Sequence, residues 1–367
     1  MIVGVPTEIK NHEYRVGLVP SSVRELTARK HEVLVQQGAG LGIGLTDSDY
    51  VAAGARIVED AAGVFDQSEM IVKVKEPQAV ERAMLREHHL LFTYLHLAPD
   101  PDQTRDLVDS GACCIAYETV TDADGRLPLL APMSEVAGRL SVQAGAASLE
   151  KAKGGSGVLL GGVPGVEPGR VVVIGGGVVG INAVQMAVGL GANVSVLDRS
   201  LDVLRKIDLQ FDSRLNTVFS TAESIERLCL EADLVIGGVL IPGAAAPKLV
   251  TRDIIKKMRP GSVFVDVAID QGGCAETSKA TTHDDPIYTV DDVVHYCVAN
   301  MPGAVPRTST FALNNATLPF VISLAQKGAE AAMAHNPHLR NGLNVFRGKV
   351  TQKEVAEALG YDYTPYH

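Results

Sequence analysis

Residues Val171–Asp198 read VVVIGGGVVGINAVQMAVGLGANVSVLD, and this stretch decides the fold of the chain. It opens with a short β-branched run, 171–174, which favours a strand over a helix. Three glycines follow in the spacing Gly175-x-Gly177-x-x-Gly180, and a helix-like segment then leads to a second apolar run that ends in Asp198. Strand, glycine turn, helix, strand and acid, in this order, are typical of a dinucleotide-binding βαβ unit.

Each part of the motif has its own physical role in this interpretation. Gly175 suits the backbone angles of a tight turn, Gly177 lets a diphosphate approach the backbone, and Gly180 lets the helix pack close to the strand. The N-terminus of the helix offers free N–H groups and the positive end of its dipole to the phosphates. Asp198 would accept hydrogen bonds from ribose hydroxyls and repel a 2′-phosphate, which predicts NAD over NADP; the adjacent Arg199 weakens that preference.

Two other interpretations of this stretch are open. The chain carries no charged residue between Arg170 and Asp198, as in a membrane span, but glycines and three polar residues, Asn182, Gln185 and Asn193, interrupt the run. A βαβ unit that binds no nucleotide is the second alternative. The complete pattern favours the nucleotide site over both.

Composition limits the class of protein and its partners. The 367 residues are 46% hydrophobic and 21% charged, which predicts a large core and about two domains. The formal charge of −10 argues against nucleic acid or an anionic membrane as a partner. The five cysteines form no C-x-x-C motif, so we expect reduced, buried thiols. The start MIVGVPTEIK lacks the pattern of a signal peptide, and we expect a cytoplasmic protein.

Short apolar runs alternate with helical segments on both sides of the motif, which predicts α/β architecture with parallel sheets and right-handed crossovers. We predict two doubly wound domains. Residues 1–128 together with 308–367 form a flavodoxin-like substrate domain, and residues 129–307 form an inserted Rossmann domain that binds NAD. A long helix from Met133 to about Lys153, with Ser134 near its cap, would connect them.

Ligands of open α/β sheets bind beyond the carboxyl ends of the strands. Polar residues follow expected strands at four such places: Lys75 follows 70–74, with Lys73 two residues earlier on the same face of that strand, His96 follows 90–95, Asp270 follows 263–267, and Asn300 follows Val298. A cleft between the lobes would bring them together.

This set of side chains suits hydride transfer to a small keto acid. Arg15 or Lys75 could hold the substrate carboxylate, and arginine does so in bidentate fashion. A histidine near neutral pKa can donate a proton to the carbonyl oxygen, and a carboxylate can accept a second proton. Each residue alone is equally well explained as a surface group. The close histidine pairs are poor metal-ligand patterns, so we expect no metal site.

Seven stretches of the chain strongly resemble the family of bacterial L-alanine dehydrogenases, which share their fold with the NAD-binding subunit of proton-translocating transhydrogenase. They cover the chain almost end to end: GVPTEIKNHEYRVGLVP (4–20), IVKVKEP (71–77), FTYLHLAP (92–99), PMSEVAGRLSVQAGA (132–146), GVLLGGVPGVEPGRVVVIGGGVVG (157–180), VDVAIDQGGCAET (265–277) and HYCVANMPGAVPRTST (295–310).

The resemblance implies reversible conversion of L-alanine, NAD and water into pyruvate, ammonium and NADH by a homohexamer. It marks Arg15, Lys75 and Asn300 as substrate-binding and His96 and Asp270 as the acid/base pair. For NAD it adds, to the glycines and Asp198 of the motif, Ser134, Val178, Val179, Ser220, Val239, Leu240, Ala268, Lys279 and Met301, with Asn300 also near the cofactor. The stretch RSLDVL after Asp198 has no basic residue between Arg199 and Arg205, which departs from members with a basic adenosine-ribose contact.

Two alternatives remain at this point. A transhydrogenase subunit would dock on a membrane partner and pass hydride to another domain. Another amino-acid dehydrogenase of the same fold, such as a lysine or saccharopine enzyme, would need additional carboxylates near its substrate.

Overall fold

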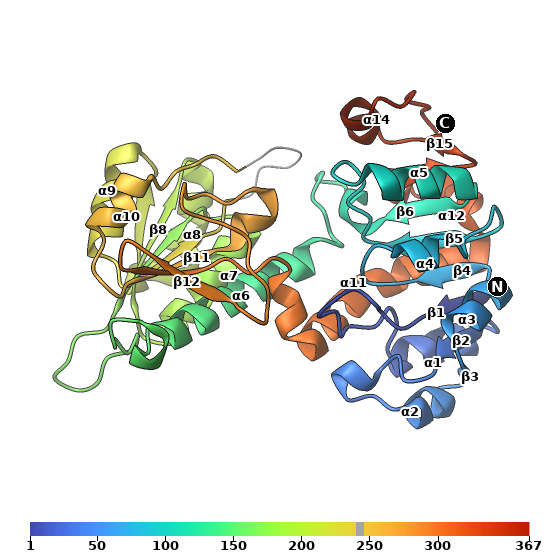
Figure 1. Ribbon diagram of the computed structural model, residues 1–367, viewed down its shortest axis with the longest axis horizontal. Coiled ribbons are helices and arrows are strands. Elements are labelled where there is room, and N and C mark those ends of the chain that lie inside the picture. The colour runs from blue at the N-terminus through green and yellow to red at the C-terminus, as the bar shows by residue number, and fades with distance from the viewer. Residues whose placement is uncertain (240–245, 367) are drawn as a thin grey trace. The chain divides into compact units, whose positions relative to one another are not determined.

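The computed structural model describes residues 1–239 and 246–366 (Figure 1). The chain folds into two compact units: residues 1–133 with 305–366 form the first, and residues 134–304 form the second. The sequence placed these boundaries near residues 128 and 308. Each unit is a sheet with helices on both faces, which confirms the doubly wound α/β class.

The first unit has an eight-stranded sheet in the order β15-β14-β6-β5-β4-β1-β2-β3. Its strands are β1 (Ile2–Val5), β2 (Glu32–Gln36), β3 (Arg56–Val58), β4 (Met70–Val72), β5 (Leu90–Thr93), β6 (Cys113–Ala116), β14 (Leu343–Phe346) and β15 (Lys349–Val350). The first six strands by number are parallel, whereas β14 runs antiparallel to both β6 and β15. Strands β4, β5 and β6 are apolar and buried at almost every position because helices cover both faces.

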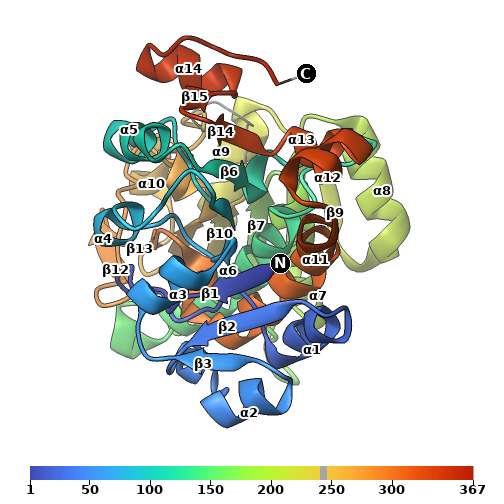
Figure 2. The same ribbon diagram turned by 90° about the vertical axis from the view of Figure 1, so that its right-hand side faces the viewer.

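Helices from both ends of the chain cover this sheet. Figure 2 shows α3, α4 and α5 on one face and α1, α11 and α12 on the other. The helices of the unit are α1 (Pro20–Ala28), α2 (Asp47–Ala52), α3 (Ala61–Gln67), α4 (Ala79–Arg82), α5 (Pro101–Ser110), α11 (Pro306–Lys327), α12 (Ala329–His335), α13 (Pro337–Arg340) and α14 (Lys353–Leu359). The C-terminal segment therefore belongs to the N-terminal sheet.

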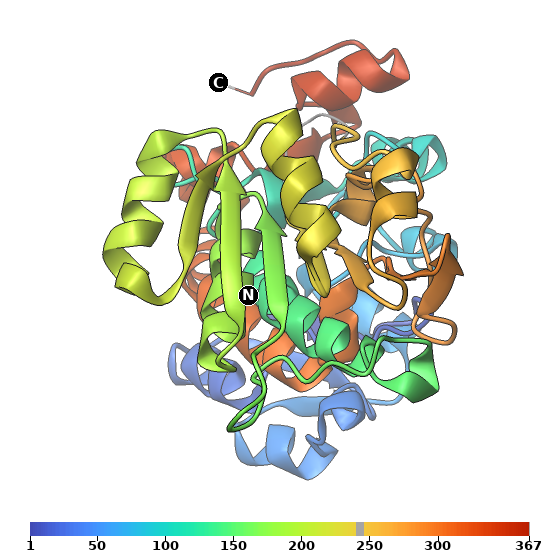
Figure 3. The ribbon, with the colours of Figure 1, turned by 90° about the vertical axis from the view of Figure 1, so that its left-hand side faces the viewer.

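The second unit has a seven-stranded sheet in the order β12-β13-β11-β10-β7-β8-β9, and α9 and α10 lie in front of its strands in Figure 3. Its strands are β7 (Arg170–Ile174), β8 (Asn193–Asp198), β9 (Asn216–Phe219), β10 (Leu234–Gly237), β11 (Val263–Asp266), β12 (Ile287–Val290) and β13 (Val293–Tyr296). Its helices are α7 (Val178–Gly189), α8 (Leu201–Phe211), α9 (Ala222–Glu231) and α10 (Arg252–Lys257), and α6 (Ala131–Ser148) enters it from the first unit.

Two details differ from the sequence prediction. A flavodoxin-like sheet has the order 2-1-3-4-5, but the first six strands here run 3-2-1-4-5-6, as in the Rossmann sheet of the second unit. Each sheet is mixed, because β12 and the β14–β15 pair run antiparallel to their neighbours.

Candidate active site

The glycine turn after β7 needs glycine at two of its three motif positions. Gly175 has φ +97°, a left-handed value that disfavours side chains. A Cβ on Gly180 would lie 1.7 Å from the carbonyl oxygen of Gly175, so only glycine lets α7 start this close to β7. Gly177 caps α7, and a Cβ there would meet no described atom within 4 Å. The turn thus leaves the space beside Gly177 open for a ligand.

The carboxylate of Asp198, at the end of β8, supports this turn. Its Oδ2 accepts the N–H of Gly176 at 2.7 Å, and its Oδ1 accepts the N–H of Ser200, the cap of α8, at 2.7 Å. The side chain remains partly exposed. This arrangement places an anionic acceptor beside the glycine turn, where the ribose of a dinucleotide would lie.

These observations fit NAD. The open space at Gly177 matches the approach of a diphosphate, the N-terminal N–H groups of α7 match its charge, and Asp198 matches a ribose diol. Val178, which is 44% exposed, begins α7, and the buried Val179 follows it.

The other expected cofactor residues lie mostly where strands of the second unit end. Ser220 follows β9 and donates its backbone N–H to Asp198 O at 3.0 Å, and Val239 follows β10. Ala268 lies in the 3₁₀ turn η5 (Val267–Gln271), and the buried Met301 opens η6 (Met301–Ala304). Lys279 places its Nζ 4.7 Å from the centroid of the Tyr288 ring.

Two expected cofactor residues need separate mention. Ser134 lies inside α6 and not at its cap, because the helix begins at Ala131. Leu240 falls in residues 240–245, outside the described part of the chain.

Asp270 lies on η5, directly after β11, and its side chain is exposed. The buried Asp266 organises the chain around it: its carboxylate accepts the N–H groups of Ala268 at 3.1 Å and Cys274 at 2.8 Å, and the Ser278 hydroxyl at 2.5 Å. From the other side, Lys248 Nζ donates to the carbonyl oxygens of 272, 273 and 275. Opposite charges therefore hold the loop that presents Asp270.

Asn300 lies between β13 and η6 and is partly buried. Its φ of +60° is left-handed, a conformation that asparagine tolerates better than most residues. Its carbonyl oxygen lies 3.3 Å from His283 Nε2. The asparagine is therefore held on a tight backbone turn in the second unit.

Arg15 lies in the connection between β1 and α1 and is only 2% exposed. Glu13 contacts one edge of its guanidinium, with Nε–Oε1 and Nη2–Oε2 distances of 2.6 Å. Nη1 lies 3.1 Å from Met133 Sδ. Burial acts to lower the pKa of Arg15, but the hydrogen bonds and charge of Glu13 outweigh it and raise that pKa. Arg15 is a fixed, permanently charged group with a defined plane.

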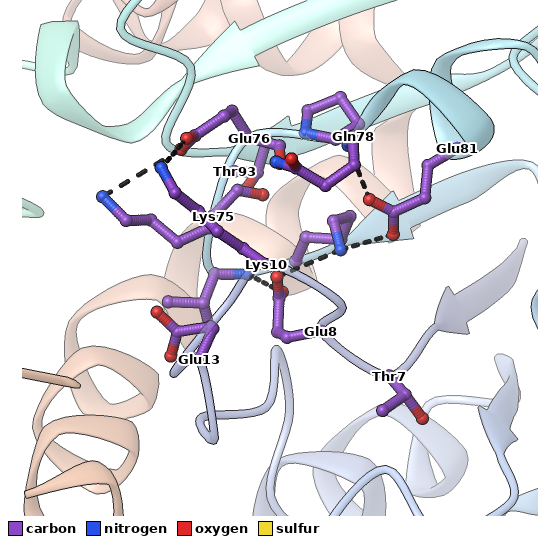
Figure 4. A network of polar contacts seen from close by, with 12 residues as sticks. Thr7, Glu8, Lys10, Glu13, Lys75, Glu76, Gln78, Glu81 and Thr93 are labelled. Carbon is purple, nitrogen blue, oxygen red and sulfur yellow. Dashed lines mark hydrogen bonds and ion pairs between the residues drawn. The ribbon is translucent and has the colours of Figure 1, made fainter. Parts of the chain in front are cut away.

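Lys75 follows β4 and is mostly buried, with its Nζ 4.0 Å from Glu76 Oε2 (Figure 4). Its carbonyl oxygen accepts the Thr93 hydroxyl at 2.9 Å, which ties it to β5. Glu76 also binds Lys10, from the connection that carries Arg15. The two expected carboxylate anchors therefore belong to neighbouring, cross-linked segments.

His96 follows β5 with a left-handed φ of +50°, held by Glu118, whose Oε1 accepts the His96 N–H at 2.6 Å. Its ring is 45% exposed, stacks on Tyr94 at 5.8 Å between centroids, and places Nδ1 3.7 Å from Glu118 Oε1. Burial raises the pKa of Tyr94, whose hydroxyl donates to Leu129 O at 2.5 Å, so the ring is a neutral platform. The strained backbone presents the imidazole at the surface of the unit.

The structure sorts the expected residues into two sets. Arg15, Lys75 and His96 gather where β1, β4 and β5 of the first unit end, and Asp270 and Asn300 share the second unit with the glycine turn. Sequence reasoning missed Glu13, Glu118 and Asp266, the carboxylates that hold Arg15, His96 and the Asp270 loop. The signal in the sequence was the proximity of Glu13 to Arg15, two residues apart, whereas Glu118 stands 22 residues from His96.

The described residues show neither a metal-ligand cluster nor a membrane-spanning helix. They contain no group of three or more metal-ligating side chains, and no described helix is long and apolar enough to cross a membrane. All five cysteines are buried and unbridged, as expected from their apolar context.

Comparison with known proteins gives a consistent result. Two family models match, "Alanine dehydrogenase/PNT, N-terminal domain" over residues 4–137 and "Alanine dehydrogenase/PNT, C-terminal domain" over residues 141–353. An alanine dehydrogenase of Halomonas elongata is 62% identical and covers 99% of this chain and 98% of its own. A solved L-alanine dehydrogenase has TM-score 0.96 at 51% identity, covering 98% and 99%. A transhydrogenase from Sinorhizobium meliloti has TM-score 0.82 at 25% identity, covering 96% and 99%.

Proposed function

The chain belongs to the alanine dehydrogenase/PNT family, and from this premise we propose that it converts L-alanine, NAD and water reversibly into pyruvate, ammonium, NADH and a proton. The observation that carries the proposal is the pairing, in one chain of this family, of a glycine turn open to a diphosphate with an arginine, a lysine and a histidine gathered at strand ends. When bound, NAD supplies the hydride acceptor.

The first unit binds the substrate carboxylate in this proposal. The planar guanidinium of Arg15, oriented by Glu13, takes the carboxylate, and the Lys75 ammonium adds a second charge. We assign Asn300 to the substrate as well. Two cations fix the orientation of the bound carboxylate. The reacting carbon next to it is thereby held in alignment for the reaction.

His96 and Asp270 exchange protons with the reacting substrate. In amination, His96 protonates the carbinolamine hydroxyl, which leaves as water as the imine forms. Asp270 accepts the proton of the amine nitrogen. In deamination the same groups act in reverse. Both side chains are exposed at strand ends, so a substrate bound there can reach them.

Residues of the second unit hold the cofactor. We propose that the turn residues Gly175, Gly177 and Gly180 with Val178 and Val179 face the diphosphate, and that Asp198 binds a ribose and favours NAD. The remaining contacts are assigned to Ser134, Ser220, Val239, Leu240, Ala268, Lys279 and Met301. We further propose a cytoplasmic homo-oligomer, a hexamer by resemblance, without nucleic-acid or membrane partners.

The test is loss of NADH absorbance with purified protein, pyruvate and ammonium, with ammonium-free and NADPH controls. We expect consumption only when ammonium is present, and faster with NADH than with NADPH. Consumption without ammonium would indicate a hydroxy-acid dehydrogenase. Bound NADH with no turnover would support the transhydrogenase-subunit alternative.

A further inference from the structure

A buried cluster of three charged side chains, Lys73, Glu8 and Glu81, lies where β4 ends. Figure 4 shows Glu8 and Glu81 of this cluster with the proposed anchor Lys75. The Lys73 side chain is 0% exposed, and its Nζ lies 2.7 Å from Glu81 Oε1 and 3.1 Å from Glu8 Oε2. The two carboxylates are also buried. Lys73 does not reach solvent, so it does not serve as a surface charge.

Each carboxylate of the cluster also accepts a hydrogen bond from a backbone N–H group near Lys75 in the sequence. Glu8 Oε1 accepts the N–H of Val74 at 2.6 Å, and Glu81 Oε2 accepts the N–H of Gln78 at 2.7 Å. The first of these N–H groups belongs to the residue just before Lys75. The second belongs to the residue three positions after Lys75. With the bond from Thr93 to the Lys75 carbonyl, the segment is fixed from several directions.

The cluster also joins this segment to the connection that carries Arg15. Glu8 lies in residues 6–19, between β1 and α1, and Lys73 and Val74 hold it against the end of β4. The Lys10–Glu76 ion pair makes a second link between the same two segments. Two charge contacts, one buried at Lys73–Glu8 and one partly exposed at Lys10–Glu76, therefore tie the connection that carries Arg15 to the end of β4.

The ammonium of Lys73 keeps its charge in this setting. Burial acts to lower the pKa of Lys73, but Glu8 and Glu81 outweigh it and raise that pKa. Buried ion pairs are often replaceable by well-packed hydrophobic side chains without loss of stability, whereas a substitution that leaves a buried charge unpaired is strongly destabilising. Stability alone therefore gives little reason for three charges at this position.

We propose that Lys73, Glu8 and Glu81 are positioning residues that set the spacing of Arg15 and Lys75 for the substrate carboxylate. This inference rests on the proposed function. It assigns the cluster an effect on carboxylate substrates and none on ammonium or on NADH, because the groups it holds are the carboxylate anchors.

The test is the neutral triple variant E8Q/K73M/E81Q. Glutamine keeps an acceptor for the Val74 and Gln78 N–H groups, and methionine fills the volume of the lysine stem. We expect a folded protein with Tm within about 5 °C of wild type. The KM for pyruvate and the KM for L-alanine should both rise at least about tenfold, whereas the KM for ammonium and the Kd for NADH change less than about twofold.

Asp106→Asn is the matched control. It removes the negative charge paired with Arg82, the residue next to Glu81 on α4, whose Nε lies 2.8 Å from Asp106 Oδ2. General loosening of α4 would raise the pyruvate KM in this variant as well, and we expect no rise beyond about twofold.

Three results would overturn the inference: a folded triple variant with wild-type pyruvate KM, an equal rise of the ammonium KM, or an equal effect of D106N. If the triple variant does not fold, Glu8→Gln replaces it, because the Lys73–Glu81 pair remains. A rise of at least about threefold in its pyruvate KM supports the inference, and a wild-type KM overturns it. A wild-type protein that consumes no NADH with pyruvate and ammonium would refute the proposed function instead.

Discussion

The two units repeat one strand order but differ in the connection at its centre. In the first unit β1 lies between β2 and β4, and in the second β7 lies between β8 and β10, so each has a switch point at the corresponding place. After β7 the chain turns through three glycines directly into α7. After β1 it makes a longer connection, residues 6–19, that carries Glu8, Glu13 and Arg15 before α1 begins.

In the proposed function, this difference gives the two units different kinds of binding site at corresponding strand ends. The second unit offers backbone N–H groups, which requires that side chains be absent, and a Cβ at Gly180 would clash at 1.7 Å. The first unit offers side-chain cations, which requires that buried countercharges hold them, as Glu13 holds Arg15. The first kind of site is sensitive to volume, and the second is sensitive to charge.

The largest expected effect is a loss of folding stability when a charge is removed from the connection of residues 6–19. Arg15→Met leaves the buried Glu13 carboxylate without its guanidinium, which should lower the free energy of unfolding by about 3–5 kcal/mol. The double variant Arg15→Met/Glu13→Gln should recover most of that loss and still bind pyruvate poorly. Urea titration of both variants measures the effect; equal destabilisation of the single and double variants would contradict a charge-based site.

Removal of the two proposed proton-transfer groups should lower turnover without affecting cofactor binding. We expect His96→Ala and Asp270→Asn each to reduce kcat by at least about 100-fold, the range for a lost general acid or base. NADH binding, followed by fluorescence titration, should stay near the wild-type value. A near-wild-type kcat in either variant would remove that residue from the mechanism.

The glycine turn should respond to volume and not to charge. Gly180→Ala forces a Cβ against the Gly175 carbonyl, and we expect it to lower the free energy of unfolding by about 1–3 kcal/mol and to impair NADH binding. Gly189→Ala is the control, because it lies at the far end of the same helix and a Cβ there meets no described atom within 4 Å. Equal stability of the two variants in thermal melts would show that the close approach is unimportant.

The smallest effect concerns cofactor choice. Asp198→Ala removes the acceptor for ribose hydroxyls and the charge that repels a 2′-phosphate, so the NAD/NADP ratio of kcat/KM should fall about tenfold. The variant also loses the bonds to Gly176 and Ser200, which would weaken both cofactors together. The ratio separates the two effects, and an unchanged ratio would argue against a ribose contact.

The sequence predicted the βα alternation because buried strands such as β1, β2 and β6 read as short apolar runs. It missed β14 and β15, which are short and stand among helices near the C-terminus. It also could not order the strands, since pairing of β1 with β4 depends on residues far apart in sequence. Helix α2 was overlooked although Thr46 and Asp49 form a capping box.

For the site, the glycine turn was predictable because its backbone demands one residue type at fixed spacing. The side-chain site was not, since Lys73 and Lys75 look equivalent in sequence, yet Lys73 is enclosed by Glu8 and Glu81 and Lys75 follows beyond the cluster. The sequence pattern indicated Lys75 as a candidate carboxylate anchor and the resemblance assigned it that role, but neither indicated what Lys73 does. Partners such as Glu81 and Glu118 come from other elements, and folding alone brings them near.

In the proposed function, the glycine turn after β7 binds NADH and the cations of the first unit bind the carboxylate. The most direct test is the Kd for NADH, measured by fluorescence titration of Gly177→Ala and Lys75→Gln. The alanine Cβ occupies space that is open in the described structure, so the account predicts a folded protein whose NADH Kd rises at least about tenfold. Lys75→Gln should leave that Kd within about twofold of wild type while the pyruvate KM rises. A wild-type Kd in Gly177→Ala, or an equal loss of NADH binding in Lys75→Gln, would contradict it.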